Sequence, residues 1–243
     1  MLHISLAAER IGSILGMPIT NSLLATWVTM AVLIIFSWAA TRNLQMIPSG
    51  IQVIAEVLIG GLYDFFKSVT GEKHINKFFP LVASFFLFII TANWLGLLPG
   101  FGTIGFFHGE EFVPLLRAAT ADLNMTIGLA LVAVIAIQYF GFKVVGFHYS
   151  SRFINFSNPI MFLLGILELV SELSKVISFA FRLFGNIFAG EVLLAVMAFL
   201  MPFLVPLPFL TLELFVGFIQ ALVFSMLTAV FLNVAVSHGE EHA

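Results

Sequence analysis

The chain has 243 residues, of which 60% are hydrophobic and 9% are charged, whereas about 25% of the residues in an ordinary soluble domain are charged. This composition indicates an integral membrane protein. The absence of cysteine excludes disulfides and zinc sites built from thiolates. The formal net charge of −3, with ten scattered Lys and Arg residues, excludes a basic patch that could bind nucleic acid.

The first predicted elements are an N-terminal segment and three crossings of the membrane. Residues 1–20 lack the pattern of a signal peptide, so we expect a retained segment on the outer side. Residues 21–40, 79–98 and 123–143 are apolar runs of the length, about 20 residues, that spans a hydrocarbon core of about 30 Å. The region 21–143 therefore predicts three upright transmembrane helices.

The charges of the connectors predict how these helices are oriented. The connector 41–78 holds four basic residues, and the connector 99–122 holds Arg117 beside three acidic residues. Because cytoplasmic loops carry the excess of Lys and Arg, the first connector is expected inside and the second outside. Lys143 and Arg152, after the third crossing, again indicate the inside, so the N-terminus is expected outside.

The first connector also contains an amphipathic pattern near residues 49–68. Ser49 could cap a helix in which Glu56 and Asp64 interrupt apolar residues. A helix of this kind lies in the membrane interface. A further full crossing is the alternative, but it would break the alternation of charge between the connectors.

The region 159–236 does not fit upright crossings. No proline interrupts residues 160–201, and a continuous helix over 159–201 would be about 63 Å long, twice the thickness of the membrane core. It must therefore tilt by about 60° or break. The segment 201–209, MPFLVPLPF, must turn, and the run that follows it is again too long for an upright crossing. We expect a steeply tilted helical hairpin, with residues 237–243 as an inner tail.

Polar residues of the first hairpin helix fall on one stripe. At 100° per residue, six of them lie within an arc of about 120° that includes Arg182, whereas Glu191 lies about 180° away. The helix is therefore expected to present two separate polar surfaces. The residues of the stripe are Glu168, Ser171, Glu172, Lys175, Ser178 and Asn186, and they are joined by Arg182.

Arg182 needs a counterion, because an arginine buried in lipid costs from about 3 to more than 10 kcal/mol. No residue three or four positions away is charged, so the partner must come from another helix or another chain. Glu213, which shares a helical face with Gln220, is a candidate within the chain. The alternative for Arg182 is a purely structural ion pair.

Acids outnumber bases in the hairpin by four to two, and uncompensated carboxyls in a low dielectric can exchange protons near neutral pH. We interpret the hairpin as a path for protons. The alternatives are that Glu191 and Glu213 reach an interface, and that Asn186 and Gln220 only join helices by a hydrogen bond. The pair Glu172 and Lys175, at i and i+3, could be structural. All six histidines fall in expected loops or tails, so no metal site and no cofactor are expected.

Several motifs resemble one family. These are FRLFGNIFAGEVLL from Phe181, the preceding ELVSELSKVISFA, the following FVGFIQALVFSMLTAVFL, PSGIQVIAE near Pro48, FFLFIITANWLGLLPGF around Asn93 and TADLNMTIGLAL around Asp122. Together they resemble subunit a of the F-type ATP synthase, the membrane stator of its proton motor, over most of the chain.

The resemblance implies roles for matching residues. Arg182 is similar to the stator arginine that faces a ring of c subunits and releases the proton of each ring carboxylate, and Asn186 and Gln220 are similar to the polar residues that flank it. Glu191, Glu213 and Asn93 resemble the lining of an outer half-channel, and Glu168, Ser171 and Ser178 that of an inner one. Gly96 departs from the family pattern, because relatives often carry an acid there.

The resemblance further implies an all-α membrane subunit without enzymatic activity of its own. Its partners would be the ring of c subunits, a peripheral stalk of b subunits, lipid and protons, in an energy-transducing membrane such as the bacterial plasma membrane. The alternative from another class is a secondary ion-coupled transporter. Transporters commonly show an internal repeat, and no second copy of the polar hairpin motif is present.

Overall fold

Most of the chain is helical in the computed structural model, which describes residues 8–14, 17–73, 75–98, 101, 104–108, 111–146, 149, 153, 159–201 and 204–237. Over these residues the structure has six α-helices, and a short 3-10 helix, η1, at Ala119–Ala121. The helices are α1 (Asn21–Thr41), α2 (Ile51–Thr70), α3 (Ile75–Gly96), α4 (Leu123–Val145), α5 (Pro159–Leu200) and α6 (Pro206–Ser237).

Five of the helices, all except α2, are long and apolar enough to cross a membrane. This confirms the three expected single crossings and the long C-terminal helices. α2 does not meet this criterion of length and apolarity, which agrees with the expectation that it lies in the membrane interface. The predicted cap of α2 is wrong, however: Gly50 is the N-cap, with φ of +59° and no side-chain capping bond. Glycine adopts this backbone conformation without steric cost, so it begins the helix in place of Ser49.

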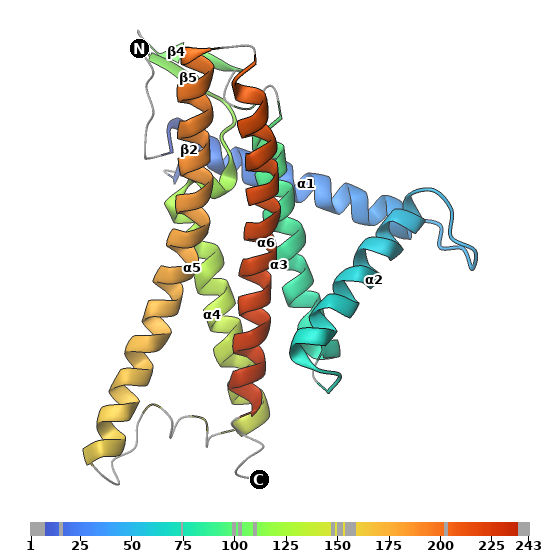
Figure 1. The fold of residues 1–243 in the computed structure, drawn as a ribbon, viewed down its shortest axis with the longest axis vertical. Helices are drawn as coiled ribbons and strands as arrows, with labels where there is room; N and C mark the ends of the chain where they lie inside the picture. Colours follow the sequence, from blue (N-terminus) through green and yellow to red (C-terminus); the bar gives the residue numbers. More distant parts are fainter. Residues whose placement is uncertain are drawn as a thin grey trace.

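The structure adds two short antiparallel hairpins that the sequence patterns did not predict. β1 (Arg10–Ile14) pairs with β2 (Met17–Thr20), and β4 (Gly105–His108) pairs with β5 (Glu111–Pro114). β1 and β2 fall in the expected N-terminal segment, and β4 and β5 in the connector after α3. Both lie near one end of the helical bundle (Figure 1).

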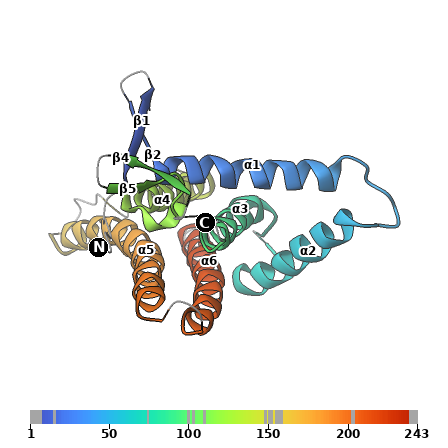
Figure 2. The same ribbon diagram turned by 90° about the horizontal axis from the view of Figure 1, so that it is seen from above.

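The helices α3, α4, α5 and α6 run roughly along one direction, whereas α1 lies across them (Figures 1 and 2). Because α1 runs across the direction of α3 and α4, these three helices cannot all stand upright in one planar membrane. α1 has 21 residues, or about 31 Å, which matches an upright crossing. With α1 upright, the long hairpin of α5 and α6 is steeply tilted.

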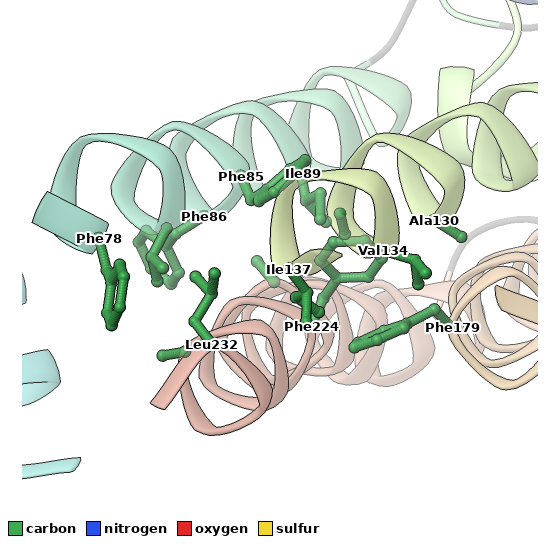
Figure 3. Packing of buried hydrophobic residues seen from close by; sticks show 14 of the residues in the cluster. Phe78, Phe85, Phe86, Ile89, Ala130, Val134, Ile137, Phe179, Phe224 and Leu232 are labelled. Atoms are coloured by element: carbon green, nitrogen blue, oxygen red, sulfur yellow. The ribbon is translucent and has the colours of Figure 1, made fainter. Parts of the chain in front are cut away.

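The core of the bundle is built from aromatic and small side chains (Figure 3). Phe224 of α6 lies between Phe85 of α3 and Phe179 of α5, with ring centroids 5.4 and 4.9 Å away. Fully buried alanines, such as Ala130 and Ala221, allow the helices to approach closely. This packing fixes the face that α5 turns toward the bundle.

α5 contributes only a narrow stripe to this core. The buried side chains Phe179, Leu183 and Ile187 follow one another at four-residue intervals, which is one face of a helix. Phe181 and Arg182, on other faces, are exposed. Much of the rest of α5 is exposed, and this part is available to lipid or to partner chains.

Candidate functional site

Arg182 projects from the exposed side of α5, one position before the buried Leu183. Its Nη2 donates a hydrogen bond to Oγ of Ser178, one helical turn earlier, at 3.1 Å. Among the residues that the structure describes, no carboxylate pairs with this guanidinium. The predicted stripe thus holds an arginine whose counterion is not supplied by the described part of its own chain.

Asn186, one turn after Arg182, joins the two hairpin helices. Its Nδ2 donates to Oε1 of Gln220 on α6 at 2.7 Å. Gln220 is 3% exposed, and its own Nε2 is buried without a hydrogen-bond partner. The bond confirms that these two residues link α5 to α6.

The predicted pair of Glu172 and Lys175 is present, with Nζ to Oε1 at 2.6 Å. Both side chains are mostly buried, and the ammonium also lies over the ring of Phe231 on α6, 4.6 Å from its centroid. The second oxygen of Glu172, Oε2, is buried without a partner. Earlier on α5, Glu168 is half-buried and Ser171 is exposed.

Glu191, on α5 and nine residues beyond Arg182, pairs with a residue that the sequence did not single out. Nη2 and Nε of Arg117 approach Oε2 of Glu191 at 3.2 and 3.3 Å. The side chain of Arg117 is 8% exposed and that of Glu191 is 39% exposed. Arg117 also lies over the ring of Phe188, 5.8 Å from its centroid. The predicted second polar surface of α5 is therefore a partly buried ion pair.

Glu213 of α6 reaches the same region. Its carboxyl lies against Gly190 of α5, in space that a side chain at position 190 would fill. Within the described residues this buried carboxyl has no hydrogen bond or ion pair, and Glu191 is its electrostatic neighbour. The predicted pairing of Glu213 with Arg182 is wrong, because Gly190 lies eight residues, about 12 Å, beyond Arg182 along the helix.

Asn93 of α3 lies in a polar cluster next to this region. Its Nδ2 donates to the carbonyl of Gly217 on α6 at 3.0 Å, and its Oδ1 accepts from Thr120 of η1 at 2.6 Å. Gly96, one turn later, packs so closely on Ala118 that an added Cβ would lie 2.6 Å from the Cβ of Ala118. A side chain at position 96 would therefore require the segment that carries Ala118 to shift.

Arg117 is a functional candidate that the sequence patterns did not indicate. In the sequence its charge bears only on the predicted side of the connector after α3. A signal was present, because Arg117 stands alone between apolar residues in VPLLRAAT, and a buried cation in such a setting needs an acidic partner. The sequence could not name that partner, because Arg117 and Glu191 are 74 residues apart and meet only through the position of η1 beside α5.

The fold and these polar groups define an all-helical, multi-pass membrane subunit with charged residues inside its bundle. Residues 23–233 match the family model described as ATP synthase A chain. The chain is 38% identical to ATP synthase subunit a of Gloeobacter violaceus over 222 residues, which is 91% of this chain and 86% of that relative. The chain belongs to the family of ATP synthase subunit a, the non-catalytic, proton-conducting stator of the membrane sector. This membership decides against a secondary transporter.

Proposed function

We propose that Arg182 is the stator group that meets the carboxylate of each c subunit as the ring turns. The observation that carries this proposal is an exposed arginine on a membrane helix whose only partner among the described residues is Ser178. An arginine in this setting requires an acid or water. A carboxylate on a moving partner would satisfy it in trans.

The chemistry follows from the charge. A guanidinium within about 4–6 Å favours the ionised form of a carboxyl group. A protonated ring carboxyl that arrives at Arg182 therefore gives up its proton to water in the adjoining path. The same positive charge opposes the direct passage of a proton along α5, so the proton must travel on the ring.

Two offset half-channels would serve this exchange. The outer one would use Glu191 and Glu213 with Asn93 at its side, and the inner one would use the stripe on the opposite side of Arg182. The proposal of two half-channels rests on the distance along α5 between these two sets of polar groups. The residues of the inner path would be Glu168, Ser171 and Ser178, and Asn186 and Gln220 would flank the arginine.

The proposal includes a location and an orientation. The chain would lie in the bacterial plasma membrane with its N-terminus outside and its C-terminus inside, as one membrane domain that also contacts a peripheral stalk of b subunits. The distribution of Lys and Arg in the connectors supports this orientation. α2 would then lie at the inner interface.

Replacement of Arg182 by Ala tests the proposal in membrane vesicles that contain the assembled complex. ATP-driven proton pumping, followed with a pH-sensitive dye, is expected to be lost. The matched control is Arg42→Ala, which removes an arginine that lies over Trp38 at the end of α1, and this variant should pump normally. Pumping by the Arg182→Ala complex would overturn the assignment.

A further inference from the structure

The region around Arg117 contains two carboxyl groups and one guanidinium that are close together. Glu191 comes from α5, Glu213 from α6, and Arg117 from the segment that precedes η1. Of the three side chains, only that of Glu191 has substantial exposure, at 39%. The next acid along the chain from Arg117, Asp122, is held by Ser22 at 2.6 Å and caps α4.

The two carboxyls differ in their surroundings. Two nitrogens of Arg117 contact one oxygen of Glu191, so the charge of Glu191 is compensated by a largely buried cation. Glu213 is 7% exposed and has no hydrogen bond or ion pair with any described residue. A nearby cation favours the charged form of a carboxyl group, whereas burial without a compensating charge favours the neutral form.

We propose that Arg117 is a positioning residue that divides the two carboxyls into separate roles: it holds Glu191 as a fixed counter-charge, and it leaves Glu213 to carry the proton. This inference rests on the proposed function and deepens it, because it names the carrier in the outer half-channel. A proton from outer water would bind the Glu213 carboxylate and leave it for a ring carboxylate. Glu191 would keep its charge throughout.

The proposed roles of Glu191 and Glu213 predict different conductances for the single and the double variants. Removal of Glu191 alone takes away the carboxylate that compensates Arg117. The charge of this guanidinium would then act on Glu213, the electrostatic neighbour of Glu191, and would hold Glu213 ionised so that it could not carry protons. Removal of Arg117 alone leaves two carboxyls that compete for one proton. Removal of both charges restores a single uncompensated Glu213, so the double variant should conduct better than either single variant.

The test measures passive proton conductance in vesicles that contain the complete membrane sector, with a potassium diffusion potential as the driving force. Rates are normalised to the amount of assembled complex. Glu191→Gln and Arg117→Met should each reduce conductance roughly tenfold. The double variant should return to within about threefold of the parent, because the effects of two charged residues in contact are not additive. Glu213→Gln should abolish conductance.

A second comparison separates charge from packing. Lys and Met have side chains of similar length but differ in charge, so Arg117→Lys should keep most of the conductance that Arg117→Met loses. Equal loss in both variants would show that Arg117 acts only by filling space, and would overturn the proposal. A double variant no better than Glu191→Gln alone would also overturn it, because Glu191 would then be the carrier.

The outcome for Arg182 distinguishes failure of the inference from failure of the proposed function. If Arg182→Ala abolishes pumping but the Arg117 and Glu191 double variant does not recover, only the division of roles is wrong. If Arg182→Ala still pumps, the proposed function itself fails, and the inference fails with it.

Discussion

Gly190 is the position where a single methyl group should disturb the proposed proton path most directly. The carboxyl of Glu213 occupies the space that a Cβ at position 190 would need. In Gly190→Ala this carboxyl must move away from α5. Because it is the end of a flexible side chain, it can move without a shift of the backbone, and the helix itself gains about 1 kcal/mol from the change of Gly to Ala.

We therefore expect the Gly190→Ala chain to assemble and to be about as stable as the parent, because overpacking costs of about 1–3 kcal/mol are offset by the gain in helix propensity. Function should not survive as well. A displacement of about 1 Å of a group that takes part in a transfer step can lower its rate up to about a hundredfold. Passive proton conductance should fall by roughly ten- to a hundredfold.

The control is Gly128→Ala on α4, where an added Cβ meets nothing within 4 Å. This variant should conduct normally. A rescue is also available, because Glu213→Asp shortens the side chain by one methylene and withdraws its carboxyl from Gly190. The double variant Gly190→Ala with Glu213→Asp should conduct better than Gly190→Ala alone. Conductance within about twofold of the parent in Gly190→Ala would refute the reasoning.

Two further predictions concern stability, measured as the temperature at which the assembled complex releases the subunit. Glu172→Leu or Lys175→Leu alone should destabilise the assembled subunit by about 3–5 kcal/mol, because each change leaves one mostly buried charge without its partner. The double variant should be about as stable as the parent. Equal losses of stability in all three variants would contradict the buried pair. Gly141→Ala should cost about 1–3 kcal/mol, because its Cβ would lie 2.7 Å from the ring of Tyr149, and Tyr149→Leu in the same chain should reduce that cost if the ring is the obstacle.

The helices could be predicted because each depends on local information. The length of α5 followed from residues 160–201, which contain no proline, and its end followed from the prolines after Met201. The direction of α1 across the bundle could not be predicted. It depends on which side chains meet between helices, and a hydropathy pattern gives the length of a crossing but not its tilt.

The polar groups show the same limit. The stripe around Arg182 and the pair of Glu172 with Lys175 were predictable, because residues on one helix have fixed angular relations. The partner of Glu191 was not, because Arg117 lies on a segment without regular periodicity. The candidate pairing of Glu213 with Arg182 was wrong, whereas its grouping with Glu191 agrees with the structure. Two facing helices can slide past each other, and contacts such as that of Glu213 with Gly190 and that of Asn186 with Gln220 fix their register.

The tilt of α5 determines what its polar residues can do. A helix of 42 residues, about 63 Å long, fits within a hydrocarbon core of about 30 Å only when it leans about 60° from the membrane normal. Glu168 and Glu191 are 23 residues apart, which is about 35 Å along the axis. At this tilt they are separated by about 17 Å in depth but by about 30 Å within the plane of the membrane. Two water paths that end near these groups would therefore be offset sideways more than vertically. A proton delivered to one path could reach the other only on a carrier that moves laterally past Arg182, which is the motion of a rotating ring.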